Sequence, residues 1–271
     1  TDIYRCIIAT ALKQLLANIP GYFQHIDNPE YLHQIRVALR RMRSGLSLLQ
    51  STEQPIAISW DKSLRKIMQK LNEARDWDVF EHEILPDILK KMTSVSEHEP
   101  IQQATLATIQ DIAIKTRQRT QKKLHHIEFT VLILAIERHL MALSSHTEMT
   151  TKEHIQQWAT KILEDRWQVL HRCCQGLTTQ TGAKRHQARI AAKKMRYAAD
   201  TLFSLFNRKN PQRFTEMLAN LQDELGYTND RRVALQLLQQ VAQKKGSAAF
   251  DLGRFSGTLE IETLQREHQS S

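Results

Sequence analysis

Two stretches of the sequence carry the same pattern, in which one histidine is followed by cationic residues. The first, HQIRVALRRMR, begins at His33, and the second, HQARIAAKKMR, begins at His186. Residues 31–49 hold four Arg, residues 184–199 hold six Lys or Arg, and neither window contains Asp or Glu. These ten positive charges exceed the formal net charge of +9 of the whole 271-residue chain. The basic surplus of the protein therefore belongs to the two motifs.

Each motif forms a cationic stripe when it is placed on a helix with about 100° per residue. Four residues of each copy fall within an arc of about 80°. They are His33, Arg36, Arg40 and Arg43 in the first copy, and His186, Arg189, Lys193 and Arg196 in the second. The apolar residues lie on the opposite side: Ile35, Ala38, Met42, Leu46 and Leu49 in the first copy, and Ala188, Ala191, Met195, Ala199 and Leu202 in the second. Arg41 and Lys194 lie off the stripe and are predicted as additional phosphate-binding residues.

The stripes have the chemistry of a polyanion site. Like charges at these helical spacings repel each other, and a bound polyanion offsets that repulsion. Arginine holds phosphate oxygens with a planar fork, lysine adds a point charge, and histidine donates hydrogen bonds. Ten residues of helix span about 15 Å, which suits several consecutive phosphates. A single such helix could be no more than a solvated basic face, but repetition with the same angles favours a binding site.

The composition predicts an all-α fold, because the eight Gly and six Pro are few and good helix formers dominate. Apolar periodicity near 3.6 predicts helices over most of the chain. The motifs fall on helices 29–51 and 184–207. Breaks are expected at residues 18–21, where the first helix, 2–18, ends, between helices 59–73 and 77–93, and between helices 211–226 and 229–245.

The repeat extends beyond the motifs and predicts an internal duplication. Leu71 matches Leu225 and Asp76 matches Asp230, both at an offset of 154 residues. The polar stretch 144–154 divides the chain into helical halves 1–146 and 147–271, each long enough for a four-helix bundle. Asp76 and Asp230 lie at expected helix starts and are predicted to cap them or to form a salt bridge with a motif arginine.

The remaining residues predict no catalytic or metal site. The segment KTRQRTQKK offers three further cations at helical spacing, Lys115, Arg119 and Lys122. The pairs His125–His126 and Cys173–Cys174 lack ligand partners at zinc spacing, and the common phosphotransfer, metalloprotease and esterase signatures do not occur. We therefore expect a protein without enzymatic activity, metal or cofactor. Three cysteines make no disulfide framework, and neither a membrane span nor a signal peptide is expected, which favours the cytoplasm.

The motifs resemble those of the CHAD domain, the conserved histidine α-helical domain, over nearly the full chain. HQIRVALRRMRSGL, EARDWDVF, HQARIAAKKMRYAADTLF and LQDELGYTND carry the resemblance in this order. It implies two helical bundles related by a pseudo-twofold axis, with the basic helices near their junction and His33 approaching His186. It also implies binding of inorganic polyphosphate and association with polyphosphate granules. Some members are fused to a triphosphate tunnel metalloenzyme domain, whose E-x-E-x-K signature is missing here.

Three alternative functions remain open from the sequence. A basic helix pair also suits the backbone of RNA or DNA. Single-strand binders usually add aromatic side chains for base stacking, whereas 6% of this chain is aromatic and Tyr197 is the one ring beside a stripe. An enzyme or enzyme accessory acting on phosphoanhydrides would normally use clustered carboxylates and a divalent ion. A scaffold for acidic protein partners is the third alternative.

Overall fold

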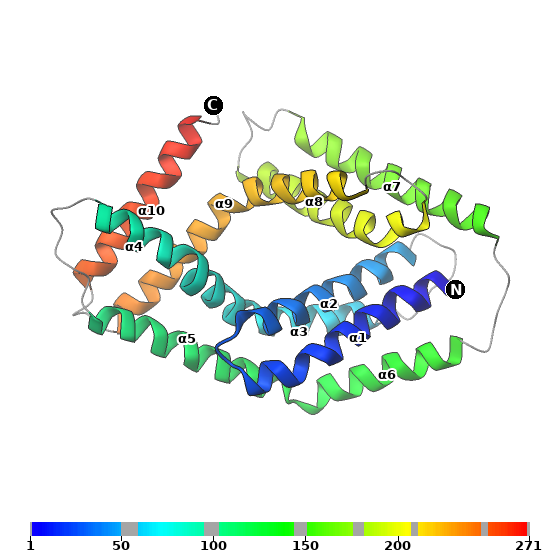
Figure 1. The fold of residues 1–271 in the computed structure, drawn as a ribbon, viewed down its shortest axis with the longest axis horizontal. Coiled ribbons are helices and arrows are strands. Elements are labelled where there is room, and N and C mark those ends of the chain that lie inside the picture. Colours follow the sequence, from blue (N-terminus) through cyan, green and yellow to red (C-terminus); the bar gives the residue numbers. More distant parts are fainter. Residues whose placement is uncertain are drawn as a thin grey trace. The chain divides into compact units, whose positions relative to one another are not determined.

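The structure is a computed structural model that describes residues 2–49, 59–94, 103–143, 151–175, 182–206, 211–244 and 249–269. Every secondary-structure element in these ranges is helical (Figure 1), which confirms the all-α prediction. The elements are α1 (Asp2–Gln24), α2 (Pro29–Leu49), α3 (Ser59–Val79), the π-helix η1 (Phe80–Ile84), α4 (Leu85–Ser94), α5 (Gln103–Leu124), α6 (Ile127–Leu143), α7 (Lys152–Cys174), α8 (Gly182–Leu202), the 3₁₀-helix η3 (Phe203–Leu205), α9 (Pro211–Lys244) and α10 (Ala249–Gln269).

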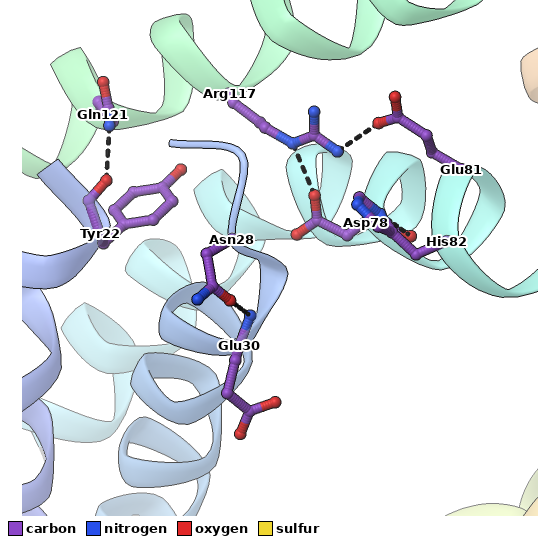
Figure 2. A network of polar contacts seen from close by, with 8 residues as sticks. All are labelled: Tyr22, Asn28, Glu30, Asp78, Glu81, His82, Arg117 and Gln121. Atoms are coloured by element: carbon purple, nitrogen blue, oxygen red, sulfur yellow. Dashed lines mark hydrogen bonds and ion pairs between the residues drawn. The ribbon is translucent and has the colours of Figure 1, made fainter. Parts of the chain in front are cut away.

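The expected break at residues 18–21 does not occur, because α1 continues through Pro20 to Gln24. The residue after this proline, Gly21, has to be small because of its neighbour Tyr31. A Cβ added at Gly21 would overlap the ring of Tyr31, so the helix backbone lies against that ring. Buried Tyr22 also anchors the end of the helix, since its carbonyl accepts a hydrogen bond from Gln121 Nε2 at 2.6 Å (Figure 2).

Two other expected breaks are also wrong. α3 runs without interruption through residues 74–76 and continues through η1 into α4, and α9 is one helix from Pro211 to Lys244. In α3, Leu71, Ala74 and Trp77 are all fully buried, so packing of this face keeps the segment helical. Asp76 and Asp230 consequently lie inside helices, and the prediction that they cap helix starts is wrong.

The first motif helix is capped as the sequence chemistry requires. Asn28 Oδ1 accepts a hydrogen bond from the backbone N–H of Glu30 at 3.0 Å (Figure 2). Pro29 occupies the first position of α2, where its missing N–H has no intrahelical acceptor to lose. The helix that carries His33 and Arg36 therefore begins at a defined residue.

The chain divides into two compact units, and each contains residues from both halves of the sequence. Unit 1 comprises Thr1–Ala17, Val37–Arg65 and Ile127–Tyr227; unit 2 comprises Asn18–Arg36, Lys66–His126 and Thr228–Ser271. These units do not correspond to the predicted halves 1–146 and 147–271, and the internal duplication stays a prediction.

Unit 1 contains the packed pair α7 and α8 together with parts of α1, α2, α3 and α9 and the whole of α6. One of its cores is built on the small residues of α8, with Ala191, Ala192 and Met195 packing against Leu170 of α7 and Leu218 of α9. Small alanines allow close approach of neighbouring helices, so the apolar side of the second motif helix is fixed in place.

Unit 2 has a larger core of α3, η1, α4, α5, α9 and α10, in which Trp77, Phe80 and Phe255 are fully buried. Polar contacts supplement this core at two places. Thr105 donates a hydrogen bond to buried Asp251 at 2.8 Å, and Glu262 of α10 pairs with Lys91 of α4 and with Arg231 of α9. The C-terminal helix is thereby attached to three other helices of the unit.

Candidate phosphate-binding site

The helical wheel of the first motif is confirmed by burial. Ile35, Ala38 and Met42 are 0% exposed, and Leu46 is 7% exposed. The side chain of Leu49 lies outside the described residues. All four stripe residues, His33, Arg36, Arg40 and Arg43, are half-buried. α2 thus buries its apolar face and carries its cations along the opposite face.

Arg36 is oriented in unit 2 by neutral acceptors on α3. Its Nη1 donates to Asn72 Oδ1 at 2.6 Å and to the carbonyl oxygen of Met68 at 3.3 Å. Asp76 lies one helical turn beyond Asn72. Burial raises the pKa of Asp76 to about 6; the charge of Arg36 opposes this shift, and that of Asp230 adds to it. Asp76 therefore interacts electrostatically with Arg36, and the predicted salt bridge between a motif arginine and Asp76 stays a prediction.

Arg40, Arg41 and Arg43 belong to unit 1. The guanidinium carbon of Arg40 lies over the Tyr197 ring of α8, 5.7 Å from the ring centroid. Arg43 holds Asp61 of α3 with two nitrogens, Nε to Oδ1 at 2.7 Å and Nη2 to Oδ2 at 3.4 Å. Arg41 donates to Gln14 Oε1 at 2.5 Å. The end of the first stripe is therefore joined to α3 and α8, and the neighbouring Arg41 joins α2 to α1.

The second motif helix, α8, shows the same division of its faces. Its five apolar positions, Ala188, Ala191, Met195, Ala199 and Leu202, are at most 4% exposed. Among its cations, His186 and Lys194 are exposed, whereas Arg189, Lys193 and Arg196 are half-buried. The second stripe is therefore more open to solvent at its histidine end than the first.

Arg189 and Arg196 are both held by α9. Arg189 Nη1 donates to the carbonyl oxygen of Gly226 at 3.3 Å. Arg196 donates to Gln222 Oε1 at 3.4 Å and lies 3.8 Å from Asp200 Oδ2. Gln222 is itself fixed, because its Nε2 donates to the carbonyl oxygen of Ala192 at 3.2 Å. The second stripe thus rests on the part of α9 that precedes Tyr227.

The two copies make matching contacts. Arg36 reaches Asn72, and Arg189 reaches Gly226, which stands 154 residues after Asn72. Met68, the second acceptor of Arg36, has Gln222 at the same offset. Arg36 and Arg189 therefore contact corresponding positions, whereas Gln222 is contacted by Arg196 and the equivalent Arg43 binds Asp61 instead, so the internal duplication stays a prediction.

The structure places Arg40 and Arg43 in the same compact unit as the whole second stripe. His33 and Arg36 belong to the other unit, so the predicted approach of His33 to His186 stays a prediction. The role of each stripe residue, and of Arg41 and Lys194, in phosphate binding likewise stays a prediction.

The three predicted cations of segment 115–123, Lys115, Arg119 and Lys122, all lie exposed on α5, and their role in phosphate binding stays a prediction. Lys115 pairs with Asp111 at 2.7 Å, Arg119 reaches Glu73 at 3.5 Å, and Lys122 is exposed. Between them, Arg117 is 2% exposed and bonds Asp78 Oδ1 at 2.8 Å and Glu81 Oε2 at 2.5 Å (Figure 2). The charge pattern alone did not identify this buried arginine.

Arg117 is the centre of a buried polar network in unit 2. Burial raises the pKa of Asp78, and the hydrogen bond and charge of Arg117 only partly offset this shift. Burial likewise raises the pKa of the nearby Tyr22, with a further contribution from the charge of Asp78. His82, which stands close by in Figure 2, shares a hydrogen bond of 3.1 Å with the carbonyl oxygen of Asp78. The network attaches α5 to the junction of α3 and η1.

Sequence reasoning missed the residues that orient the motif arginines. Asn72, Gln222 and Asp61 make these contacts from neighbouring helices. Asn72 lies one residue after Leu71, which matches Leu225 in the repeat. This position next to a matched residue was the one feature of the sequence that pointed to Asn72. The helix pairings that bring these side chains to the arginines are tertiary contacts.

Within the described ranges, no group of three His, Cys, Asp or Glu side chains is placed to hold a metal ion. No helix in the described part of the chain is long and apolar enough to cross a membrane.

Comparisons with known proteins agree with the fold. The model of the CHAD domain family matches residues 6–239. A crystal structure of the CHAD domain from the plant Ricinus communis is 25% identical, covers 98% of this chain and 86% of its own, and superimposes with a TM-score of 0.78. PptA from Streptomyces chartreusis is 17% identical, covers 99% of this chain and 98% of its own, and gives a TM-score of 0.59, which shows a shared fold. No curated protein matches the sequence.

Proposed function

The chain belongs to the CHAD domain family, and we propose that it binds inorganic polyphosphate, without chemical turnover, through the cationic stripes of α2 and α8. The observation that carries the proposal is the contact between Arg40 and Tyr197, 5.7 Å from guanidinium carbon to ring centroid. This contact joins the two motif helices within unit 1, so cations from both copies are available to one extended anion.

The way in which the arginines are held also supports anion binding. Arg36 and Arg189 donate to an amide oxygen and to backbone carbonyl oxygens, which are neutral acceptors. A neutral acceptor orients the guanidinium without itself adding a negative charge. Half-burial further limits the rotamer entropy that each side chain loses on binding. The stripes are thereby ordered in advance for a chain of phosphates.

Polyphosphate fits this arrangement because it presents charge without bases. Each phosphate held by a cation releases counterions. The logarithm of the affinity therefore falls linearly with the logarithm of the salt concentration, with a slope set by the number of phosphate contacts. The family association with polyphosphate granules makes them the place where we propose that this chain acts. Nucleic acid remains the competing ligand, since its backbone offers the same phosphate chemistry.

The test is a calorimetric titration of long-chain polyphosphate over a salt series, with single-stranded RNA of matched charge as competitor. Wild type is compared with Arg36→Ala/Arg189→Ala and with Arg138→Ala, a control that removes one exposed cation of α6. We expect tighter binding of polyphosphate than of RNA, at least a tenfold loss in the double variant, and a salt slope shallower by one to two, following about 0.7–0.9 per phosphate contact. The control should lose little.

Equal binding of both polymers would reduce the site to a general polyanion surface. Unchanged binding in the double variant would place the site elsewhere. Turnover is tested separately by incubating polyphosphate with the protein and Mg²⁺. We expect no release of orthophosphate above that of a protein-free control, and release that depends on the protein would contradict the binding-only proposal.

A further inference from the structure

Tyr197 lies immediately after the second stripe, on the same helix as Arg196. Its ring is half-buried in unit 1. The ring faces the first motif helix, because Arg40 Cζ stands over it, 5.7 Å from the centroid. Arg40 is half-buried as well. A residue of the second copy therefore contacts a cation of the first.

The contact has a physical effect on Arg40. A guanidinium over an aromatic face is attracted by the ring quadrupole, and this attraction strengthens when the pair is partly desolvated. Arginine has several rotatable bonds, and a side chain held against a ring loses much of that freedom before any ligand arrives. A phosphate that binds Arg40 therefore meets a guanidinium whose orientation is already restricted.

The same contact changes what the ring can do. Stacking of bases on aromatic rings is the usual means by which proteins add affinity for single-stranded nucleic acid. One face of Tyr197 is covered by the Arg40 guanidinium, so a base that used this face would have to displace a cation. The ring of Tyr197 therefore contacts the Arg40 guanidinium on the face that a nucleobase would otherwise use for stacking.

We propose that Tyr197 is a positioning and specificity-determining residue that acts through Arg40. It holds the guanidinium for phosphate and withholds a stacking surface from nucleobases. This inference rests on the proposed polyphosphate function and narrows its ligand class to phosphate chains without bases. The phenolic hydroxyl has no part in it, because the ring face makes the contact.

A double-mutant cycle on the full chain tests the inference. The variants are Arg40→Ala, Tyr197→Leu, the combination of both, and the conservative Tyr197→Phe, with long-chain polyphosphate as the probe. We expect Tyr197→Leu to weaken binding by about threefold to tenfold, the range of a partly desolvated cation–π contact. Tyr197→Phe should bind as wild type does. In the Arg40→Ala background, Tyr197→Leu should change the affinity less than twofold, because the residue through which it acts is absent.

A second arm uses single-stranded RNA as the probe. Arg40→Ala uncovers the ring, so we expect the ratio of RNA affinity to polyphosphate affinity to rise. Adding Tyr197→Leu to Arg40→Ala should then lower RNA binding, because the stacking surface is lost. An unchanged ratio in Arg40→Ala would contradict the specificity part of the proposal.

The outcomes separate the inference from the proposed function. If wild type binds polyphosphate but the effects of Arg40→Ala and Tyr197→Leu multiply, Tyr197 does not act through Arg40 and the inference is overturned. A loss of affinity in Tyr197→Phe would also overturn it, since the ring is retained. If wild type does not bind polyphosphate, both statements fail. Thermal unfolding of each variant shows whether it is folded, and Tyr197→Met replaces Tyr197→Leu if the leucine variant is not.

Discussion

Arginine has two contrasting environments in this chain. Arg117 of α5 is 2% exposed, and the carboxylates of Asp78 and Glu81 both bind it. Arg36 and Arg189 of the motif helices are half-buried and donate to an amide oxygen or to backbone carbonyls. In the first environment the charge is neutralised and the side chain joins helices. In the second, these hydrogen bonds orient the side chain through neutral acceptors.

The difference teaches how to separate structural cations from binding cations. Burial of a charge requires a counter-charge, because desolvation of an unpaired ion costs several kcal/mol. A half-exposed cation needs none, and a neutral acceptor suffices to orient it. The last position of each stripe lies between these cases, since Arg43 pairs with Asp61 and Arg196 approaches Asp200. We therefore expect the inner positions of the stripes to contribute more to anion binding than the last ones.

The largest expected effect concerns the buried network. Asp78→Ala leaves the buried Arg117 with one of its two carboxylates and should lower the free energy of unfolding by about 3 kcal/mol or more. Urea denaturation followed by circular dichroism measures the loss. Arg189→Ala in the same assay should cost about 1 kcal/mol or less. Equal losses in the two variants would remove the distinction between the two environments.

The next effect concerns Asp76, the acid beside a motif arginine. Its pKa is about 6 in the folded protein against an ordinary value of 3.8, so the folded state binds this proton more tightly. The stabilisation is complete below about pH 4 and is lost as the pH rises through 6. Relative to Asp76→Asn, wild type should lose roughly 1–2 kcal/mol of unfolding free energy over that interval, after allowance for partial exposure.

Urea denaturation of wild type and Asp76→Asn at pH 4, 5, 6 and 7 measures this difference. Taking the difference between the two proteins removes the contributions of the other titrating groups. A difference that is constant with pH, or one that grows in favour of wild type, would contradict a raised pKa for Asp76.

A smaller effect follows from converting one environment into the other. Asn72→Asp replaces the neutral acceptor of Arg36 by a carboxylate and so imitates the surroundings of Arg117. Polyphosphate affinity should fall by about threefold to tenfold, because charge-assisted pairing competes with the ligand for the guanidinium. Asn72→Ala, which removes the hydrogen bond without adding charge, should lose less. If the two variants bind equally, the neutral character of the acceptor has no role.

The smallest expected effect concerns the one position at which the stripes differ in residue type. Lys193 stands in the second copy where the first has Arg40. Lys193→Arg keeps the charge and adds a bidentate fork, so polyphosphate affinity should rise by about twofold. The reverse change, Arg40→Lys, should lower it by more, because the contact with Tyr197 is weakened as well. Titration calorimetry at fixed salt measures both.

The sequence predicted well wherever one helix suffices to decide the outcome. The positions of α2 and α8, the burial of their apolar arcs and the segregation of their cations all follow from a period of 3.6 residues. It predicted poorly at three breaks. Pro20 indicated a helix end that does not occur, and the break expected between residues 73 and 77 is absent because packing of Leu71, Ala74 and Trp77 keeps α3 helical. A local signal of this kind is weaker than the burial of a continuous face.

What the sequence determined by itself is the all-α class, the two cationic stripes and the types of their residues. Helical periodicity and charge are properties of neighbouring positions, so they can be read without a fold. Only the tertiary structure decided which acceptor each arginine meets: Asn72 for Arg36, Gly226 for Arg189 and the Tyr197 ring for Arg40. It also decided that Arg117, charged like its neighbours Lys115 and Arg119, is buried against Asp78. Such pairings join residues that are far apart in the chain, and packing of helix faces brings them together.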